Sequence, residues 1–247
     1  MNIAAEIFFD PQGHTERGVS METVIEGIDS ALQRARDELG ISSCLILCFL
    51  RHLDQDSAFE TLEAALPWSD RIVGVGLDSS ELGHPPSKFA RVFETARENG
   101  LNVVAHAGEE GPPSYITGSL DLLHVDRIDH GVRCLEDDDL VRRLKEEQIP
   151  LTVCPHSNVK LRVFDTMKDH NIRKLIQKGL CASIHSDDPA YFGGYIGDNY
   201  TSVVQALHLD QEEILQLAKN AIDAAFLTPE EKTILLNKLE ESITKHQ

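Results

Sequence analysis

Residues 88–110, KFARVFETARENGLNVVAHAGEE, decide the fold, because they read as a helix followed by a buried strand. The range Lys88–Glu98 places its apolar residues three and four positions apart, the spacing of a helix with one apolar face. Gly100 stands where this helix should end, since glycine adopts the left-handed backbone of a helix C-terminus without steric cost. The apolar run Leu101–Ala105 is continuous rather than alternating, which is typical of a parallel strand buried on both faces.

The same alternation of helix and strand recurs along the chain. Met21–Leu39 carries another apolar helical stripe and is followed by Gly40. Two further helices are expected near the end of the chain, with Asp210 and Thr228 as their N-terminal caps. Those helices are Asp210–Phe226 and Pro229–His246, and the runs expected to be strands are Ile3–Phe9, Cys44–Leu50, Ile72–Leu77, Leu101–Ala105, Arg127–Asp129, Pro150–Cys154 and Leu180–Ile184.

Seven such βα units fit either an open doubly wound sheet or a closed barrel. No Gly-x-Gly-x-x-Gly follows the first expected strand, and no Gly-x-x-x-x-Gly-Lys-Ser/Thr occurs, so the usual nucleotide-binding sheets are disfavoured. We therefore expect a (β/α)₈ TIM-type barrel that lacks its first strand, with the C-terminal helices added. A single domain over residues 1–247 is expected, because no run of Gly, Ser or Pro reads as a linker.

The composition narrows the classes of partner. Asp and Glu number 41 against 23 Lys and Arg, so the surface should repel phosphate backbones and anionic lipids. We expect no nucleic acid or membrane partner and a neutral or cationic small molecule instead. The five cysteines include no Cys-x-x-Cys pair and are expected to be reduced thiols of a cytoplasmic protein. No apolar run reaches bilayer length, no signal peptide is recognised, and the oligomeric state is left open.

Polar side chains follow three of the expected strands. His106 and Glu109 come after the fourth, His130 is the central residue of the DHG segment at the fifth, and Asp187 with Asp188 follows the seventh. Because reactive groups gather at the carboxyl ends of barrel strands, we expect these side chains to converge. Each residue alone also has a structural reading, as a hydrogen-bonded histidine, a solvated loop or a turn. Together they are the groups needed to hold a divalent metal and to move protons around a bound water.

Three segments resemble, in this order, the adenosine/adenine deaminase family of metal-dependent hydrolases. They are VAHAGE at 104–109, DHG at 129–131 and SDDP at 186–189, and the resemblance extends over essentially all 247 residues. Segments 6–12 (EIFFDPQ), 76–81 (GLDSSE) and 188–194 (DPAYFGG) resemble the adenine deaminase branch more than the nucleoside branch.

The resemblance implies a role for each residue at the strand ends. His106 and Asp187 are implied to be zinc ligands, with one zinc ion per subunit. Glu109 is implied to donate a proton to the purine ring, His130 to orient and help deprotonate the attacking water, and Asp188 to bind the base. The implied reaction is hydrolytic deamination of adenine to hypoxanthine and ammonia in purine salvage. Zinc would lower the pKa of its water towards ~7, and burial would keep Glu109 protonated.

One part of the family pattern is not found. The first strand of the family normally ends in His-x-His, which supplies two further ligands, and nothing in Met1–Gln12 matches it. His14 has no partner histidine two residues away and is not expected to replace them. We expect one metal-dependent deaminase domain over residues 1–247 that is either N-terminally truncated or a natural short form, with zinc affinity and activity of this chain alone open.

Several alternatives stay open at this point. The substrate could be adenosine, or the chain could be a catalytically impaired purine-binding fragment or a purely structural α/β protein. A His/Cys/Cys deaminase site is not expected, because no Pro-Cys-x-x-Cys occurs. The loop Ser79–Pro86 either covers the substrate where a ribose would lie or is an ordinary connection. His52 and His185 either line a pocket or are structural, whereas Ser157 and Asn158 are expected to orient loops.

Overall fold

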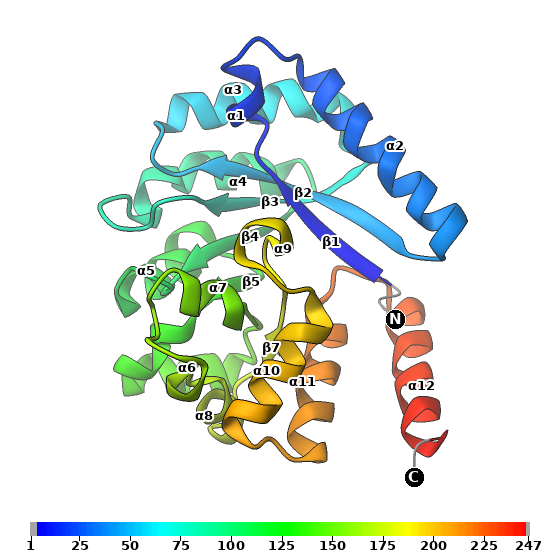
Figure 1. The fold of residues 1–247 in the computed structure, drawn as a ribbon. Helices are drawn as coiled ribbons and strands as arrows, with labels where there is room; N and C mark the ends of the chain where they lie inside the picture. The colour runs from blue at the N-terminus through cyan, green and yellow to red at the C-terminus, as the bar shows by residue number, and fades with distance from the viewer. Residues whose placement is uncertain (1–3, 246–247) are drawn as a thin grey trace. The chain divides into compact units, whose positions relative to one another are not determined.

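The computed structural model describes residues 4–245 (Figure 1). The expected strand start at Ile3 and helix end at His246 lie outside the described residues. The described chain falls into two compact units. The first contains residues 4–106 and 118–126, and the second contains residues 107–117 and 127–245.

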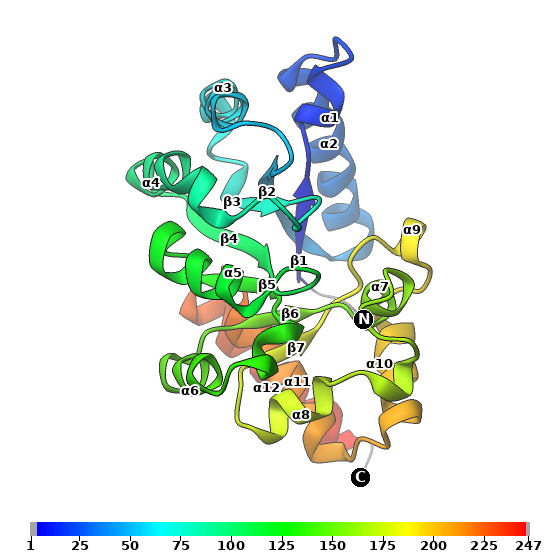
Figure 2. The same ribbon diagram turned by 90° about the vertical axis from the view of Figure 1, so that its left-hand side faces the viewer.

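The first unit is built on four parallel strands paired in chain order, β1 with β2, β2 with β3 and β3 with β4. Helices α2, α3 and α4 lie on one side of these strands, and α2 and α3 contact β2 while α4 contacts β3 (Figures 1 and 2). Its elements are β1 Ala4–Phe9, α1 Gln12–Thr15, α2 Met21–Leu39, β2 Ser42–Leu50, α3 Gln55–Ala65, η1 Leu66–Trp68, β3 Ile72–Asp78, η2 Pro86–Phe89, α4 Ala90–Glu98, β4 Asn102–Ala107 and η3 Ser119–Leu123, with Ala107 assigned to the second unit.

The helix boundaries in this unit follow from local chemistry. Ser20 caps α2 by accepting a hydrogen bond from the Thr23 N–H at 3.2 Å, and Gly40 ends it at φ +67°. Gly100 follows α4 at φ +80°, so both predicted glycine stops are confirmed. The predicted helix Lys88–Glu98 is wrong at its start, where η2 occupies Pro86–Phe89 and α4 begins only at Ala90.

The second unit is built on three parallel strands, β5 paired with β6 and β6 with β7. Helices α8, α10 and α11 contact β7 (Figure 2). Its elements are α5 Pro113–Gly118, β5 Arg127–His130, η4 Val132–Glu136, α6 Asp138–Glu147, β6 Leu151–Val153, α7 Pro155–Lys160, η5 Met167–Asp169, α8 Ile172–Gln177, β7 Ala182–Ile184, α9 Pro189–Phe192, α10 Ile196–Leu207, α11 Gln211–Ala224 and α12 Pro229–Lys245, with Gly118 assigned to the first unit.

Strands β6 and β7 are shorter than the apolar runs from which they were predicted. The run Pro150–Cys154 loses both ends, because Pro150 lacks a donor and Cys154 already caps α7, whose first residue is Pro155. The predicted caps of the last two helices are confirmed. Asp210 accepts from the Glu213 N–H at 2.9 Å, and Thr228 accepts from the Glu231 N–H at 3.3 Å.

Four of the five cysteines, Cys48, Cys134, Cys154 and Cys181, are buried, as expected of thiols in apolar runs. Burial also raises the pKa of the Cys134 thiol to about 12. Among residues 4–245, no helix combines the length and apolar composition needed to cross a bilayer.

A buried arginine joins three segments of the first unit. The Arg51 side chain is fully buried, and its guanidinium donates to the His84 carbonyl at 2.9 and 2.7 Å and to the His106 carbonyl at 2.7 Å. It therefore ties the end of β2 to the loop after β3 and to the end of β4. Five donors in a fixed planar fork suit arginine to such a multiple contact.

We expect Arg51→Met to lower the free energy of unfolding by at least about 2 kcal/mol, since each buried acceptor left without its donor costs about 1–3 kcal/mol. Urea titration followed by circular dichroism measures the change. Arg36→Met is the matched control, because that guanidinium is exposed and donates a long hydrogen bond to the Ser43 carbonyl, at 3.4 Å. Equal destabilisation by the two substitutions would contradict this account of Arg51.

The second unit buries a neutral histidine. His170 is 3% exposed, and its Nδ1 accepts a hydrogen bond from the Ile172 N–H at 3.1 Å while its Nε2 lies 3.2 Å from Oδ1 of Asn158. The Phe164 ring packs against it with centroids 4.4 Å apart. Burial lowers the pKa of His170 from 6.5 to about 3, because the charged imidazolium would lose its hydration.

This lowered pKa makes the folding stability depend on pH. The unfolded chain protonates His170 below pH 6.5, whereas the folded ring stays neutral until about pH 3, so stability is full above pH 6.5 and falls across that window. In His170→Gln the free energy of unfolding should fall by roughly 3–5 kcal/mol less than in the wild type when the pH is lowered from 6.5 to about 3. Urea titrations at several pH values test this, with the exposed His14→Gln as control. An unchanged pH slope in His170→Gln would show that burial of this ring does not drive the acid sensitivity.

Candidate active site

Three of the predicted site residues come together in the second unit. Glu109 follows β4, His130 ends β5 and Asp187 follows β7. His130 Nδ1 lies 3.2 Å from Oε1 of Glu109, and its Nε2 lies 4.0 Å from Oδ2 of Asp187. The side chains are 2%, 12% and 24% exposed for His130, Glu109 and Asp187, so the group runs from a buried ring to a partly open carboxylate.

The backbone at this group is strained. His130 and Asp187 adopt left-handed backbone angles, φ +64° and +56°, which side chains other than glycine seldom occupy. Such conformations persist only where surrounding structure enforces them, and they cluster at functional sites. Gly131 continues the turn at φ +67°, and a Cβ there would lie 2.8 Å from Cδ2 of Leu151. The strand end therefore needs glycine immediately after the histidine.

A fully buried amide connects Glu109 to His130. Asn158, in the first turns of α7, has its Nδ2 2.8 Å from Oε1 of Glu109 and 3.2 Å from Nδ1 of His130. From the sequence, Asn158 was expected to orient loops, and its contact with both residues was missed. The available signal was its position four residues after the end of an apolar run, on a helix that Pro155 starts at a strand end.

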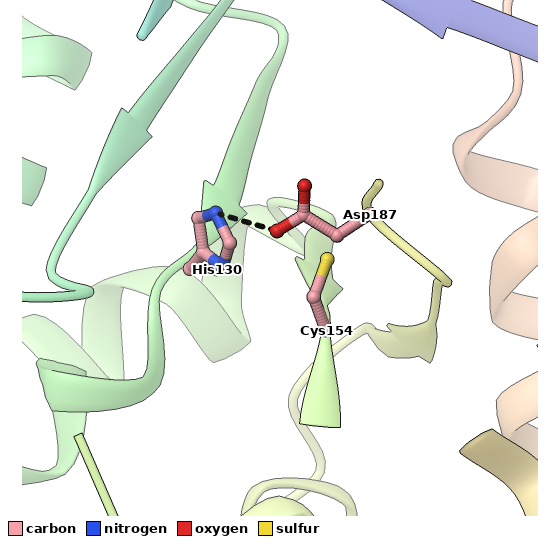
Figure 3. A group of neighbouring side chains, drawn as sticks. All are labelled: His130, Cys154 and Asp187. Carbon is pink, nitrogen blue, oxygen red and sulfur yellow. Dashed lines mark ion pairs between the residues drawn. The ribbon is translucent and has the colours of Figure 1, made fainter. Parts of the chain in front are cut away.

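A cation could be held at the same place. His130, Cys154 and Asp187 each offer a ligand atom, and these atoms lie within 4.8 Å of one another (Figure 3). Burial raises the pKa of Cys154 well above its ordinary value, and the charges of Asp187, Glu109 and Asp129 raise it further. These carboxylates create a negative potential around Cys154. That potential disfavours the thiolate form of the cysteine and favours a bound cation. Nitrogen and carboxylate donors in such a field fit a divalent ion such as zinc.

The neighbouring acids have structural contacts of their own. Asp188 caps α9, and its Oδ1 accepts from the N–H groups of Ala190 and Tyr191 at 3.1 and 3.2 Å. The structural reading of the Asp-Asp-Pro segment as a helix start is therefore correct for this residue, and its predicted contact with the base stays a prediction. Asp129 is buried between Thr152 Oγ1, at 2.7 Å, and Arg127 Nε, at 3.6 Å.

His106 belongs to the first unit, where it lies on β4. Its ring centroid is 5.8 Å from that of Phe8, and its carbonyl accepts from Arg51 at 2.7 Å. Of the five predicted site residues, Glu109, His130 and Asp187 are therefore seen together and Asp188 is next in sequence. The convergence of His106 with them stays a prediction.

A buried carboxyl pair beside His106 was not predicted. Burial raises the pKa of Asp78, at the end of β3, and the charge of Asp10 and a hydrogen bond between the two side chains raise it further, whereas nearby His106 lowers it. The Asp78 carboxyl therefore binds a proton more strongly than a free aspartate, as expected of a buried acid beside a second carboxyl group. Both aspartates come directly after expected strands, which was the available signal.

Three further histidines considered from the sequence have structural partners. His14 is exposed and lies 3.2 Å from Arg17, His52 bonds Ser79 Oγ at 2.8 Å, and His185 bonds Ser183 Oγ at 2.8 Å.

Comparison with known proteins agrees with this geometry. A family model described as adenosine deaminase matches residues 3–242. An adenine deaminase from Hahella chejuensis is 59% identical over 244 residues, which cover 99% of this chain and 73% of that protein. The solved structure of an adenine deaminase from Arthrobacter aurescens is similar with a TM-score of 0.96 and 49% identity, over 98% of this chain and 74% of that chain.

An amidohydrolase from Burkholderia ambifaria, solved with bound Zn, is similar with a TM-score of 0.93 and 26% identity, over 98% of this chain and 68% of that chain. The seven parallel strands in chain order within residues 4–245, together with these similarities, confirm the predicted TIM-type barrel fold lacking one strand. The match to the family model over nearly all its residues shows that the chain belongs to the adenosine deaminase family.

Proposed function

We propose that this chain hydrolyses adenine to hypoxanthine and ammonia, in purine salvage, at a zinc site formed with His106 and Asp187. The observation that carries the proposal is an identity of 55–59% to adenine deaminases over 92–99% of the chain. The group of Glu109, His130 and Asp187 supplies the proton-transfer chemistry that this reaction needs.

The proposal of a zinc ion rests on the residue types that would bind it and on the negative potential around them. Asp187 and His106 are residue types that zinc prefers, and the carboxylates around Cys154 create the negative potential that a dication needs. A bound zinc ion would supply a water whose pKa is lowered towards ~7. In the proposal, Asp187 and His106 hold the ion, and His130 directs its Nε2 towards the water.

Proton transfer falls to the residues of the second unit. A bond forms between the water oxygen and the ring carbon that bears the amino group, while the adjacent ring nitrogen takes a proton from Glu109. Asp187 accepts the proton that the water loses. The exocyclic nitrogen then takes the proton held by Asp187, its bond to the ring carbon breaks and ammonia leaves, while the new hydroxyl group gives its proton to Glu109 and becomes the carbonyl of hypoxanthine. The second oxygen of Asp188 is proposed to hold the base, since its Oδ1 is engaged in capping α9.

The substrate is tested by incubating the zinc-loaded chain with adenine, adenosine and N6-methyl-AMP and following the ultraviolet change on deamination. We expect turnover of adenine with the highest kcat/KM, and loss of turnover after chelation that zinc restores. Metal analysis of Asp187→Asn should show less bound zinc than the wild type. Faster loss of adenosine would overturn the choice of substrate, and purine binding without zinc or turnover would show a binding fragment instead.

We expect Glu109→Gln to lower kcat for adenine by about 10²–10⁴-fold, the usual contribution of a positioned general acid, with little change in adenine binding. Steady-state kinetics and equilibrium binding of adenine separate the two effects. Glu110→Gln is the matched control, because Glu110 is the next residue in the chain and its side chain is exposed. Retention of wild-type kcat in Glu109→Gln would remove this residue from the mechanism.

A further inference from the structure

The tautomer of His170 can be read from its contacts. The Ile172 N–H donates to Nδ1 at 3.1 Å, so this nitrogen carries a lone pair. Because burial keeps the ring neutral, its one proton must then lie on Nε2. Nε2 is 3.2 Å from Oδ1 of Asn158, to which it donates.

This contact fixes the orientation of the Asn158 amide. With Oδ1 facing the His170 N–H, the amide nitrogen faces Oε1 of Glu109 at 2.8 Å and Nδ1 of His130 at 3.2 Å. In the opposite orientation the Asn158 amide oxygen would face the Glu109 carboxyl oxygen, so two acceptors would meet. The Asn158 amide nitrogen would face the His170 Nε2–H, so two donors would meet. Asn158 is fully buried, so water cannot relieve that conflict.

The amide nitrogen has two hydrogens and can only donate. One of these hydrogens faces His130 Nδ1, so in a neutral ring Nδ1 accepts and the ring proton lies on Nε2, the nitrogen 4.0 Å from Oδ2 of Asp187. Glu109 Oε1 is likewise an acceptor, so the carboxyl proton of its acid form is directed to the other oxygen. One amide thus sets the proton positions of both neighbours.

We propose that Asn158, held in one orientation by His170, is a positioning residue that places the proton of His130 on Nε2 and that of Glu109 on Oε2. The consequence for catalysis rests on the proposed deaminase function, whereas the consequence for the His130 tautomer does not. The main chain of Asn158 has a separate role, since its carbonyl accepts from the Val163 N–H at 2.9 Å. Substitution of the side chain therefore leaves this turn intact.

The tautomer is tested without any turnover, by two-bond ¹⁵N–¹H spectra of the full chain labelled at its histidine nitrogens. His130 signals are assigned by their loss in His130→Gln. The wild type should show His130 protonated at Nε2. In Asn158→Leu the proton should move to Nδ1, because the Glu109 carboxylate 3.2 Å away becomes its acceptor.

Asn171→Leu is the control for loss of a half-buried amide, because Asn171 Nδ2 donates to the Val132 carbonyl at 2.7 Å and should not affect the tautomer. A wild-type His130 protonated at Nδ1, or an Nε2 proton that stays in place in Asn158→Leu, would overturn the proposal. These outcomes do not depend on whether adenine is the substrate.

Kinetics test the catalytic consequence. Asn158→Leu should lower kcat for adenine about 10²-fold while KM changes less than about threefold, as expected when proton transfer is lost and binding is kept. His170→Gln retains an N–H donor at the position of Nε2 and should keep kcat within about threefold, whereas His170→Leu should lower it as Asn158→Leu does. Wild-type kcat in both leucine variants, or a rise in KM alone, would show that the amide does not position the acid.

Discussion

His130 Nδ1 and Glu109 Oε1 lie 3.2 Å apart at the end of β5, and when both atoms accept hydrogen bonds a donor beside them stabilises the pair. The Asn158 amide is that donor. Its own orientation depends on His170, whose ring is held neutral by burial and oriented by the backbone at the start of α8. The arrangement of the reactive groups therefore depends on a short chain of hydrogen bonds whose far end lies in the packed interior of the second unit.

The same end of the sheet stores backbone strain. His130 and Asp187 hold left-handed angles that each cost of order 1–3 kcal/mol, and they do so at the ends of strands of only four and three residues. Helices packed against β7 and the close fit of Gly131 against Leu151 hold these residues in place. The carboxylates gathered nearby add electrostatic repulsion, visible in the raised pKa of Cys154. A bound cation would relieve that repulsion and stabilise the unit that carries it.

The sequence predicted the features that depend on local pattern. Helix α2 was expected at its observed bounds, because its apolar spacing, its terminal glycine and its length are all properties of consecutive residues. The order of strands and the caps at Asp210 and Thr228 followed in the same way, whereas the meeting of Glu109, His130 and Asp187 was expected because side chains at the carboxyl ends of parallel strands lie at one edge. Strand ends were less well predicted where a proline or a helix cap interrupts an apolar run, as at Cys154.

The residues that were missed depend on contacts between distant segments. Asn158 bonds residues 49 and 28 positions away, and no local pattern states that its amide is buried. Asp10 and Asp78 form a pair only because β1 and β3 both end at the same edge of the first unit. Resemblance to a family suggested roles for single residues, but only coordinates show which side chain orients another.

The buried guanidinium of Arg51 also governs how the segment after β3 can move. Two hydrogen bonds to the His84 carbonyl fasten that segment near its C-terminal end, so residues 79–83 form one short arm that is held at both ends. A short arm samples fewer conformations, and less entropy is lost when it settles over a bound molecule. Displacement of the whole segment would require Arg51 to leave its carbonyl partners.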